Sequence, residues 1–286
     1  MPELPEVETV RRGLERRVLG QTISSVMVLY PQVIRGDAAR FCREIEGRRV
    51  ACLFRKGKTL AIELHSGDAR PSVHLIIRLG MTGQLVVAKT GDPLLSHTHV
   101  RLILEGGHEE LRFRDPRRFG MLRRCTEQEA EAIFDSLGPD ALEISEVEFN
   151  GALQGRRGAV KAWLLNQRMV AGLGNIYADE ALFEAGIHPQ TPAGDIPAIR
   201  RRLLYRSIRK VLRQAVRLQG TSFRDYVDAE GNPGNFESRL RAYRRTGLPC
   251  RRCGAPIRRV VVSGRSSHFC PDCQPRRRRQ RRRSRE

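Results

Sequence analysis

The sequence predicts an α+β protein: a helix at the N-terminus, a β-sandwich behind it, a helical domain, and a small four-cysteine segment near the C-terminus. Apolar residues recur at helical spacing in residues 3–19, short β-rich runs with glycine turns fill residues 21 to about 124, and helical patterns follow from residue 126. The 286 residues suffice for two domains with separate cores. We expect domains at 1–138, 139–235 and 236–274, and a disordered polybasic tail at 275–286.

The first helix is predicted from Val7, Val10, Leu14 and Val18, which repeat at helical spacing before Gly20. Many short strands separated by such turns are typical of a sandwich or barrel. The β-rich runs are residues 22–30, 48–54, 59–64, 72–79, 83–88, 99–104 and 110–115. Helices are expected at 126–137, about 145–153, 158–169, 175–185 and 195–218, with a Gly/Pro/Asp boundary near 138–142.

The charge of the chain indicates a polyanionic partner. The 52 lysines and arginines outnumber the 32 acids, which gives a formal net charge of +20, and the tail accounts for only +7 of it. Such an excess attracts nucleic acid, the commonest polyanion in a cell. An acidic membrane surface is the competing partner, but the sequence has no basic amphipathic helix with an aromatic face. Its acidic start differs from a secretory signal, so we expect a cytoplasmic protein, associated with the nucleoid in a bacterium.

Four of the seven cysteines have the spacing of a metal site. Cys250, Cys253, Cys270 and Cys273 form C-x2-C-x16-C-x2-C, in which two close pairs supply four thiolates to one tetrahedral ion. Disulfides are the alternative, but they are uncommon in the cytoplasm. We expect one structural Zn²⁺. The scattered Cys42, Cys52 and Cys125 are expected to be reduced thiols.

The chain opens with "MPELPEVETV". Methionine before proline is normally removed, which leaves Pro2 as a secondary amine with an ordinary pKa of ~8. Such an amine can condense with a sugar C1′ to give an iminium, the electron sink that elimination requires. Glu3 beside it can carry the proton. The alternative is an acidic start that is merely solvated, but the apolar stripe of the helix anchors these residues.

Four further segments contain candidate groups, and each has a structural alternative. In "FRKGKTL", Lys56 and Lys58 are two of the chain's five lysines, although arginine is its usual cation. A site that needs a compact or deprotonatable ammonium would keep lysine there, whereas the alternative is a polar hairpin turn. In "GLGNIY", the glycines precede a helix that begins at Asn175, which predicts a phosphate cradle, whereas the alternative is a plain helical hairpin.

The other two segments, "LGMTGQL" and "FRDPRRFG", place Met81, Arg117 and Phe119 on two loops. Apolar side chains can fill a gap in a base stack while a guanidinium pairs with the base left behind. The alternative is a core methionine and phenylalanine with an arginine paired to Asp115. The sequence therefore predicts an intercalating wedge.

Together these segments resemble formamidopyrimidine-DNA glycosylases, the bifunctional repair enzymes for oxidised purines. The resemblance runs from Pro2 to about Cys273 and rests on "PELPEVET", "KGK", "LGMTG", "DPRRFG", "GLGNIYADEALFEAGIHP" and the four cysteines, in the family's order. It implies a helix–two-turn–helix domain and a C-terminal zinc finger. It also implies a monomer that binds double-stranded DNA with oxidised purines or abasic sites, and that cleaves the strand by β,δ-elimination through a Schiff base.

The resemblance assigns roles to individual residues. Pro2 would be the nucleophile, Glu3 the proton donor and Lys58 a phosphate contact that assists elimination. Met81, Arg117 and Phe119 would fill the space of the flipped nucleotide. The remaining contacts that it implies are Glu6, which would order the N-terminal site, and His99, Arg118, Arg157, Asn175, Thr221 and Arg265.

Two departures and two rival functions accompany this resemblance. Arg78 stands where the family usually has histidine, and Gln219 replaces one glycine of a pair. If that position requires a positive φ, glutamine costs roughly 1 kcal/mol, and we expect a preference for formamidopyrimidines over 8-oxoguanine.

One rival function is that of an endonuclease VIII-like enzyme for oxidised pyrimidines, which "DPRRFG" and "LGMTG" argue against. The other is a non-catalytic DNA-binding zinc protein, which has no use for a free proline amine.

Overall fold

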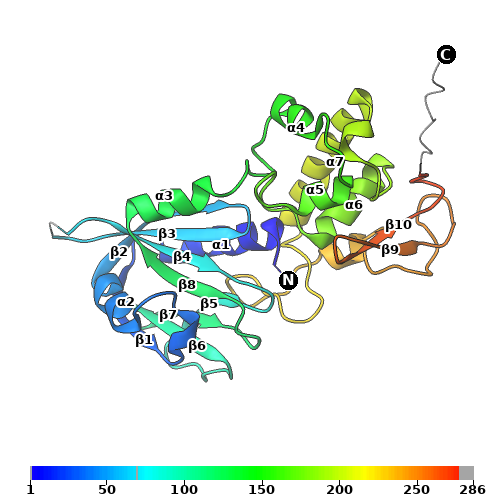
Figure 1. The fold of residues 1–286 in the computed structure, drawn as a ribbon. Helices are drawn as coiled ribbons and strands as arrows, with labels where there is room; N and C mark the ends of the chain where they lie inside the picture. The colour runs from blue at the N-terminus through cyan, green and yellow to red at the C-terminus, as the bar shows by residue number, and fades with distance from the viewer. Residues whose placement is uncertain (1, 69, 277–286) are drawn as a thin grey trace, which may run out of the picture. The chain divides into compact units, whose positions relative to one another are not determined.

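The computed structural model describes residues 2–68 and 70–276 (Figure 1). The chain divides into two compact units, Met1–Asp140 with Leu212–Ser238 and Ala141–Val211 with Arg239–Glu286. Most of the polybasic tail expected at 275–286 lies outside the described residues. Within the described part of the chain, no helix has the length and apolar character needed to cross a lipid bilayer.

The first unit begins with helix α1 (Leu4–Val18), in which Pro5 occupies the first turn, where its missing N–H costs nothing. The stripe predicted from the sequence is buried along its whole length, from Val7 to Val18. Gly20 follows the helix with a φ of +81°, a left-handed conformation that glycine adopts without strain. The helix therefore forms where the apolar spacing predicts it.

The body of this unit is one antiparallel sheet of eight strands in the order β5-β7-β6-β1-β2-β3-β4-β8. A single core of buried apolar side chains draws on α1 and on both halves of the sheet, so the two halves cover each other as in a sandwich. The predicted fold class is confirmed. The strands are β1 (Thr22–Val28), β2 (Arg48–Lys56), β3 (Thr59–His65), β4 (Val73–Arg78), β5 (Gln84–Lys89), β6 (Thr98–Leu104), β7 (Glu109–Arg114) and β8 (Met121–Cys125).

Two elements of this unit differ from the sequence prediction. Helix α2 (Ala38–Ile45) lies in a region predicted to be β-rich. Its first turn is capped by Asp37, whose side chain accepts from the N–H of Arg40, and its core face is only Phe41 and Ile45. Strand β8 was not predicted, because two of its five residues are arginines, and it forms by pairing with the edge of β4. Helix α3 (Glu127–Asp135) follows it, as expected.

The end of helix α7 (Ala198–Arg217) and the loop behind it belong to the first unit. The helix ends in a left-handed turn at Gln219 (φ +61°) and Gly220 (φ +83°), where the Gly220 N–H donates to the Ala215 carbonyl at 2.8 Å. A Cβ on Gly220 would lie 2.8 Å from the Glu6 carboxylate. The positive φ considered for Gln219 is therefore present, as part of the end of the helix.

The second unit is helical with a C-terminal hairpin. Its elements are α4 (Glu146–Leu153), α5 (Val160–Leu165), α6 (Asn175–Ala185), the first part of α7, and the hairpin of β9 (Arg258–Val262) and β10 (Arg265–Phe269). Helix α5 ends before the predicted residue 169 because the Asn166 side chain accepts from the N–H of Arg168 and forms a turn. Ser263 and Gly264 both have positive φ, which suits a two-residue hairpin turn.

Candidate active site and nucleic-acid interface

The N-terminal residues are fixed by a buried carboxylate. Pro2 and Glu3 are buried ahead of α1, and Glu6 is 1% exposed. One oxygen of Glu6 accepts from the Glu3 N–H and the other accepts from the Thr221 N–H, each at 2.8 Å. Because both oxygens accept from N–H groups, Glu6 fixes the N-terminal residues, which include the predicted nucleophile Pro2, to the segment after α7.

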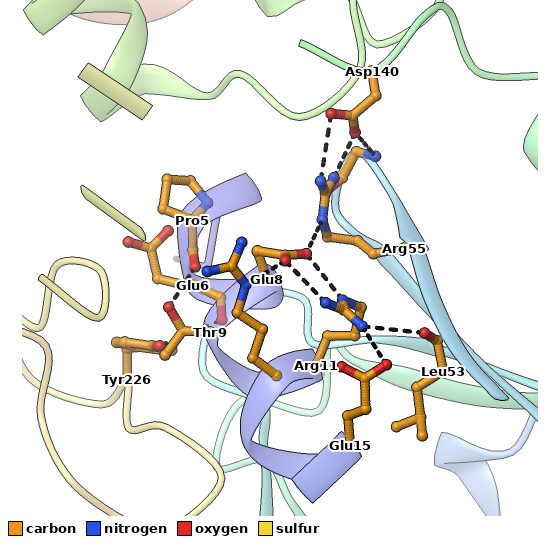
Figure 2. A network of polar contacts seen from close by, with 12 residues as sticks. Pro5, Glu6, Glu8, Thr9, Arg11, Glu15, Leu53, Arg55, Asp140 and Tyr226 are labelled. Carbon is orange, nitrogen blue, oxygen red and sulfur yellow. Dashed lines mark hydrogen bonds and ion pairs between the residues drawn. The ribbon is translucent and has the colours of Figure 1, made fainter. Parts of the chain in front are cut away.

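A buried charge network holds the turn that precedes Lys58 (Figure 2). The side chain of Arg55 is 5% exposed, and its guanidinium donates to Glu8 on α1 at 3.1 Å and to Asp140 at 2.5 Å. Asp140 also accepts from the Gly57 N–H at 2.8 Å, and Arg55 donates to the Gly57 carbonyl at 3.0 Å. Both peptide groups of Gly57 are held, so the backbone leading to Lys58 is fixed to α1.

Glu8 is the helix end of this network. It accepts from Arg11 at 3.1 Å and from Arg12 at 2.7 Å in addition to Arg55. Burial alone raises the pKa of Glu8, but the hydrogen bonds from these three arginines outweigh it and lower that pKa to about 2. Glu8 therefore stays ionised at any pH near neutrality.

The predicted wedge residues lie on two loops of the first unit. Met81 is half-buried between β4 and β5, whereas Arg117, Arg118 and Phe119 are exposed between β7 and β8. The Arg117 guanidinium lies 4.8 Å from the centroid of the Phe119 ring. Among the described residues, Asp115 forms no ion pair with an arginine and instead accepts from backbone N–H groups of its own loop. The alternative of a core phenylalanine with an arginine paired to Asp115 is therefore not what this segment forms.

Two predicted DNA contacts meet through a tyrosine that the sequence analysis missed. The Arg118 guanidinium lies 4.2 Å from the centroid of the Tyr30 ring and donates to its hydroxyl at 3.1 Å. The Tyr30 and His99 rings are 5.1 Å apart. His99 is buried, and its Nε2 is 2.9 Å from the Asp115 carbonyl.

In the second unit, a glycine turn leads into α6. Gly172 has a φ of +109°, and its N–H donates to the Gln167 side chain, which braces the turn by donating to two carbonyls. Asn175 is the first residue of α6 and is half-buried at the positive end of the helix dipole. Arg157 is exposed ahead of α5, and Arg265 is exposed at the start of β10.

A buried lysine connects α6 to the C-terminal hairpin. Lys161 is fully buried, and its Nζ lies 2.6 Å from one oxygen of Asp179 on α6. The other oxygen accepts from the backbone N–H of His268 on β10 and contacts its Nδ1, each at 2.9 Å. Because Asn175 opens α6 and Arg265 opens β10, this network fixes two predicted phosphate contacts relative to each other.

The four cysteines fit a zinc ion. Their Sγ atoms all lie within 4.8 Å of one another, with 3.9 Å between Cys250 and Cys273 and 3.4 Å between Cys253 and Cys270. Sulfurs bound 2.3 Å from a tetrahedral zinc lie roughly 3.8 Å apart. Backbone N–H groups approach two of the sulfurs at 3.4 Å, an arrangement that favours thiolates. The donor set is therefore that of a structural zinc finger.

The network around Arg55 was missed by the sequence analysis for a specific reason. Arg11 and Arg12 stand three and four residues after Glu8, a spacing that predicts ion pairs on one helix face. Arg55 and Asp140 are 85 residues apart, and no local pattern connects them. The same is true of Asp179 with His268 and of Tyr30 with Arg118.

Three family models match the chain: the formamidopyrimidine-DNA glycosylase N-terminal domain at residues 1–122, the formamidopyrimidine-DNA glycosylase H2TH domain at 137–227, and the zinc finger found in FPG and IleRS at 247–276. The chain belongs to the formamidopyrimidine-DNA glycosylase family. The formamidopyrimidine-DNA glycosylase of Desulforamulus reducens is 42% identical over 280 residues, which cover 96% of this chain and 99% of the relative. That of a Nocardioides species is 45% identical and covers 98% of this chain and 97% of the relative.

Solved structures agree with this membership. The complex of the Lactococcus lactis enzyme with DNA containing an abasic site has a TM-score of 0.88 and 36% identity, and the match covers 96% of this chain and all of that one. Members of the family are glycosylases and AP lyases with a zinc finger. The protein is a DNA repair glycosylase, as the resemblance of its motifs implies.

Proposed function

We propose that this enzyme excises formamidopyrimidines and 8-oxoguanine from duplex DNA through a covalent intermediate at Pro2, and then cleaves the strand by β,δ-elimination. The observation that carries the proposal is the anchored N-terminus. Pro2 is buried ahead of α1, and the next N–H is bonded to Glu6. An amine that must meet one carbon of a sugar benefits from such fixation, because a positioned nucleophile avoids the entropy cost of a second encounter.

The proposed reaction uses the proline nitrogen twice. Its lone pair forms the bond to C1′ while the N-glycosidic bond breaks, and the base leaves with the proton that the proline nitrogen gives up. Glu3 donates a proton to the sugar oxygen, the ring opens, and an iminium forms between Pro2 and C1′. The iminium then accepts the electrons released when the C2′ proton is removed, and the 3′ phosphate leaves. A second elimination releases the 5′ phosphate.

Lys58 would contact the phosphate beside the lesion and assist these eliminations. Support comes from the network of Arg55, Glu8 and Asp140, which fixes the backbone before Lys58 to the helix that follows Pro2 (Figure 2). A charge held on a fixed backbone stabilises developing phosphate charge without reorganisation. Lys56 differs, because its Nζ donates to the Phe134 carbonyl at 2.9 Å.

The other candidate residues would hold and open the duplex. Met81, Arg117 and Phe119 would fill the space that the flipped nucleotide leaves, and the exposure of the last two supports this role. Thr221 would lie in the segment that covers the extruded base, which Glu6 holds by its backbone. Arg118, Asn175 and Arg265 are proposed to contact the DNA backbone, and Arg157 and His99 are proposed to belong to the same DNA-binding surface.

The zinc finger would have one ion and a structural role. Zn²⁺ bound by Cys250, Cys253, Cys270 and Cys273 would fold the segment that presents Arg265. It would supply no chemistry at the sugar. We further propose that the enzyme acts as a monomer.

Borohydride trapping tests the proposed function. Duplexes with a formamidopyrimidine, 8-oxoguanine, an oxidised pyrimidine or an abasic site are incubated with the enzyme and borohydride, and adducts are located by mass spectrometry. The Lactococcus lactis enzyme has been crystallised with Fapy-dG and with oxidised-pyrimidine DNA, so both lesions belong in the panel. We expect an adduct at Pro2 and fastest excision of the purine lesions. No adduct would favour the non-catalytic binding protein, and preferred excision of the pyrimidine would favour the endonuclease VIII-like enzyme.

A further inference from the structure

A single buried carboxylate lies where the two wedge loops meet. Asp115 follows β7 and is 0% exposed. Its Oδ1 accepts from the Thr82 hydroxyl at 2.5 Å and from the Arg117 N–H at 3.2 Å, and its Oδ2 accepts from the Gly120 N–H at 2.7 Å. Thr82 follows Met81 directly, so this one side chain is bonded to both loops that contain wedge residues.

The two loops also meet through their backbones. A Cβ on Gly80, beside Met81, would lie 2.6 Å from the backbone of Phe119 and Gly120. A Cβ on Gly120 would lie 2.9 Å from the Arg78 carbonyl and 3.1 Å from the Asp115 carboxylate. Without side chains at these two positions, the loops approach closely enough for Asp115 to bond to both.

The loop that Asp115 caps contains a residue in an unfavourable backbone conformation. Arg118 has a φ of +58°, which non-glycine residues seldom adopt and which has to be stabilised by surrounding contacts. The Arg118 N–H donates to the Asp115 carbonyl at 3.2 Å, and His99 contacts the same carbonyl. The side chain and the backbone carbonyl of Asp115 therefore both stabilise the conformation of this loop.

We propose that Asp115 is the positioning residue of the wedge: it sets the separation of Met81 from Arg117 and Phe119 before the duplex is opened. This inference rests on the proposed function, in which those three side chains replace an extruded nucleotide. Its consequence is selective. Extraction of a base that is stacked and paired needs the wedge in place, whereas an abasic nucleotide has no base to unstack and depends on it less.

A carboxylate is required at this position because both of its oxygens accept. In Asp115→Asn, the amide nitrogen has to face either the Gly120 N–H or the pair formed by Thr82 and the Arg117 N–H. The hydroxyl of Thr82 can rotate and accept, but a backbone N–H cannot. In either orientation the loop of residues 115–120 loses one of its two bonds to this side chain. Either the Gly120 N–H loses its acceptor, or the Arg117 N–H keeps only the Thr82 hydroxyl, 3.2 Å away, while the volume of the side chain stays the same.

The experiment compares Asp115→Asn with wild type in single-turnover reactions on two duplexes, one with 8-oxoguanine opposite cytosine and one with a preformed abasic site. We expect excision of 8-oxoguanine to slow by about 10- to 100-fold, with abasic-site cleavage within about threefold of wild type. A 2-aminopurine placed next to the lesion in the same strand should report slower helix opening by the same factor. Thr82→Val removes the hydroxyl that bonds to Asp115 and to the Arg117 N–H but leaves the carboxylate bonded to Arg117 and Gly120, so it should give an intermediate loss.

Asp92→Asn is the matched control, because Asp92 is exposed and its side chain accepts one backbone N–H within its own turn. It should leave both reactions unchanged. Equal loss in both reactions of Asp115→Asn would make the residue merely structural and overturn the proposal, as would wild-type excision of 8-oxoguanine. Failure of the proposed function is a different result, because wild-type enzyme would then give no borohydride adduct on the abasic duplex.

Discussion

The first unit fixes its loops with carboxylates that accept from arginines and backbone N–H groups, whereas the second joins a buried carboxylate to a lysine and a histidine and gathers four cysteines at its C-terminal hairpin. Glu6, Glu8 and Asp115 each accept several hydrogen bonds in the first unit. In the second, Lys161, Asp179 and the four cysteines hold β10. We therefore expect acid to weaken the first unit, through Glu8, and metal removal to weaken the second.

The largest effect is expected for the nucleophile of the first unit. In Pro2→Gly, with removal of Met1 verified by mass spectrometry, base excision should fall about 100-fold or more, because the secondary amine is lost. Duplex binding, measured by fluorescence anisotropy, should stay within about twofold. Full activity in protein shown to retain Met1 would contradict the role of Pro2.

The opposite pattern is expected for the metal. Chelation of zinc, or Cys250→Ser, should abolish DNA binding because the hairpin that presents Arg265 needs the ion to fold. Cys52→Ser, at an exposed single cysteine, is the control and should bind normally. Replacement of zinc by cobalt should leave single-turnover excision within about twofold. A large change in rate with cobalt would argue for a metal that takes part in the chemistry.

A smaller effect should follow from the buried lysine. Lys161→Met leaves Asp179 buried without its cation, which should lower the free energy of unfolding by about 3–5 kcal/mol. Lys210→Met removes a lysine that pairs with Glu184 at 2.5 Å but is 61% exposed, and should cost less than about 1 kcal/mol. Both are measured by chemical denaturation. Equal losses would mean that burial of the Lys161 pair has no energetic consequence.

Acid should act on Glu8. Its pKa in the folded protein, about 2, lies below the ordinary value of 4.5, so its stabilising effect is complete above about pH 4.5 and is lost as the pH falls toward 2. Glu8→Gln should cost roughly 2 kcal/mol at pH 7 and make stability less dependent on pH in that interval. Glu15→Gln, on the exposed part of the same helix, is the control. A mutant as acid-sensitive as wild type would contradict this.

The smallest effect is expected at Gln219. Its φ of +61° belongs to the end of α7, so Gln219→Gly should stabilise the protein by roughly 1 kcal/mol. The preference for formamidopyrimidines over 8-oxoguanine stays a prediction, and the same mutant should narrow it in single-turnover assays. No gain in melting temperature would mean that glutamine is not strained there.

Elements that follow from a local residue pattern were predicted from the sequence, whereas contacts between residues far apart in the sequence were missed. Helix α1 and seven of the eight strands in the sheet of the first unit were predicted because their residues repeat at the spacing of their own element. The four cysteines were predicted for the same reason. Helix α2 was missed because only Phe41 and Ile45 mark its core face, and the network of Arg55 with Asp140 because those residues meet only after folding. The roles of the individual site residues stay predictions.

The burial of the N-terminus has a consequence for how the protein is made. Residues 2–10 are all buried. Glu6 accepts from the N–H of Thr221, a residue that the ribosome adds 215 residues later. At 5–20 residues per second, the ribosome needs roughly 10–40 s to produce that partner. An aminopeptidase needs an accessible chain end, so the proposed role of Pro2 predicts that Met1 is removed during this interval. The fraction of active enzyme would then depend on whether Met1 is removed before the N-terminal residues are buried by folding.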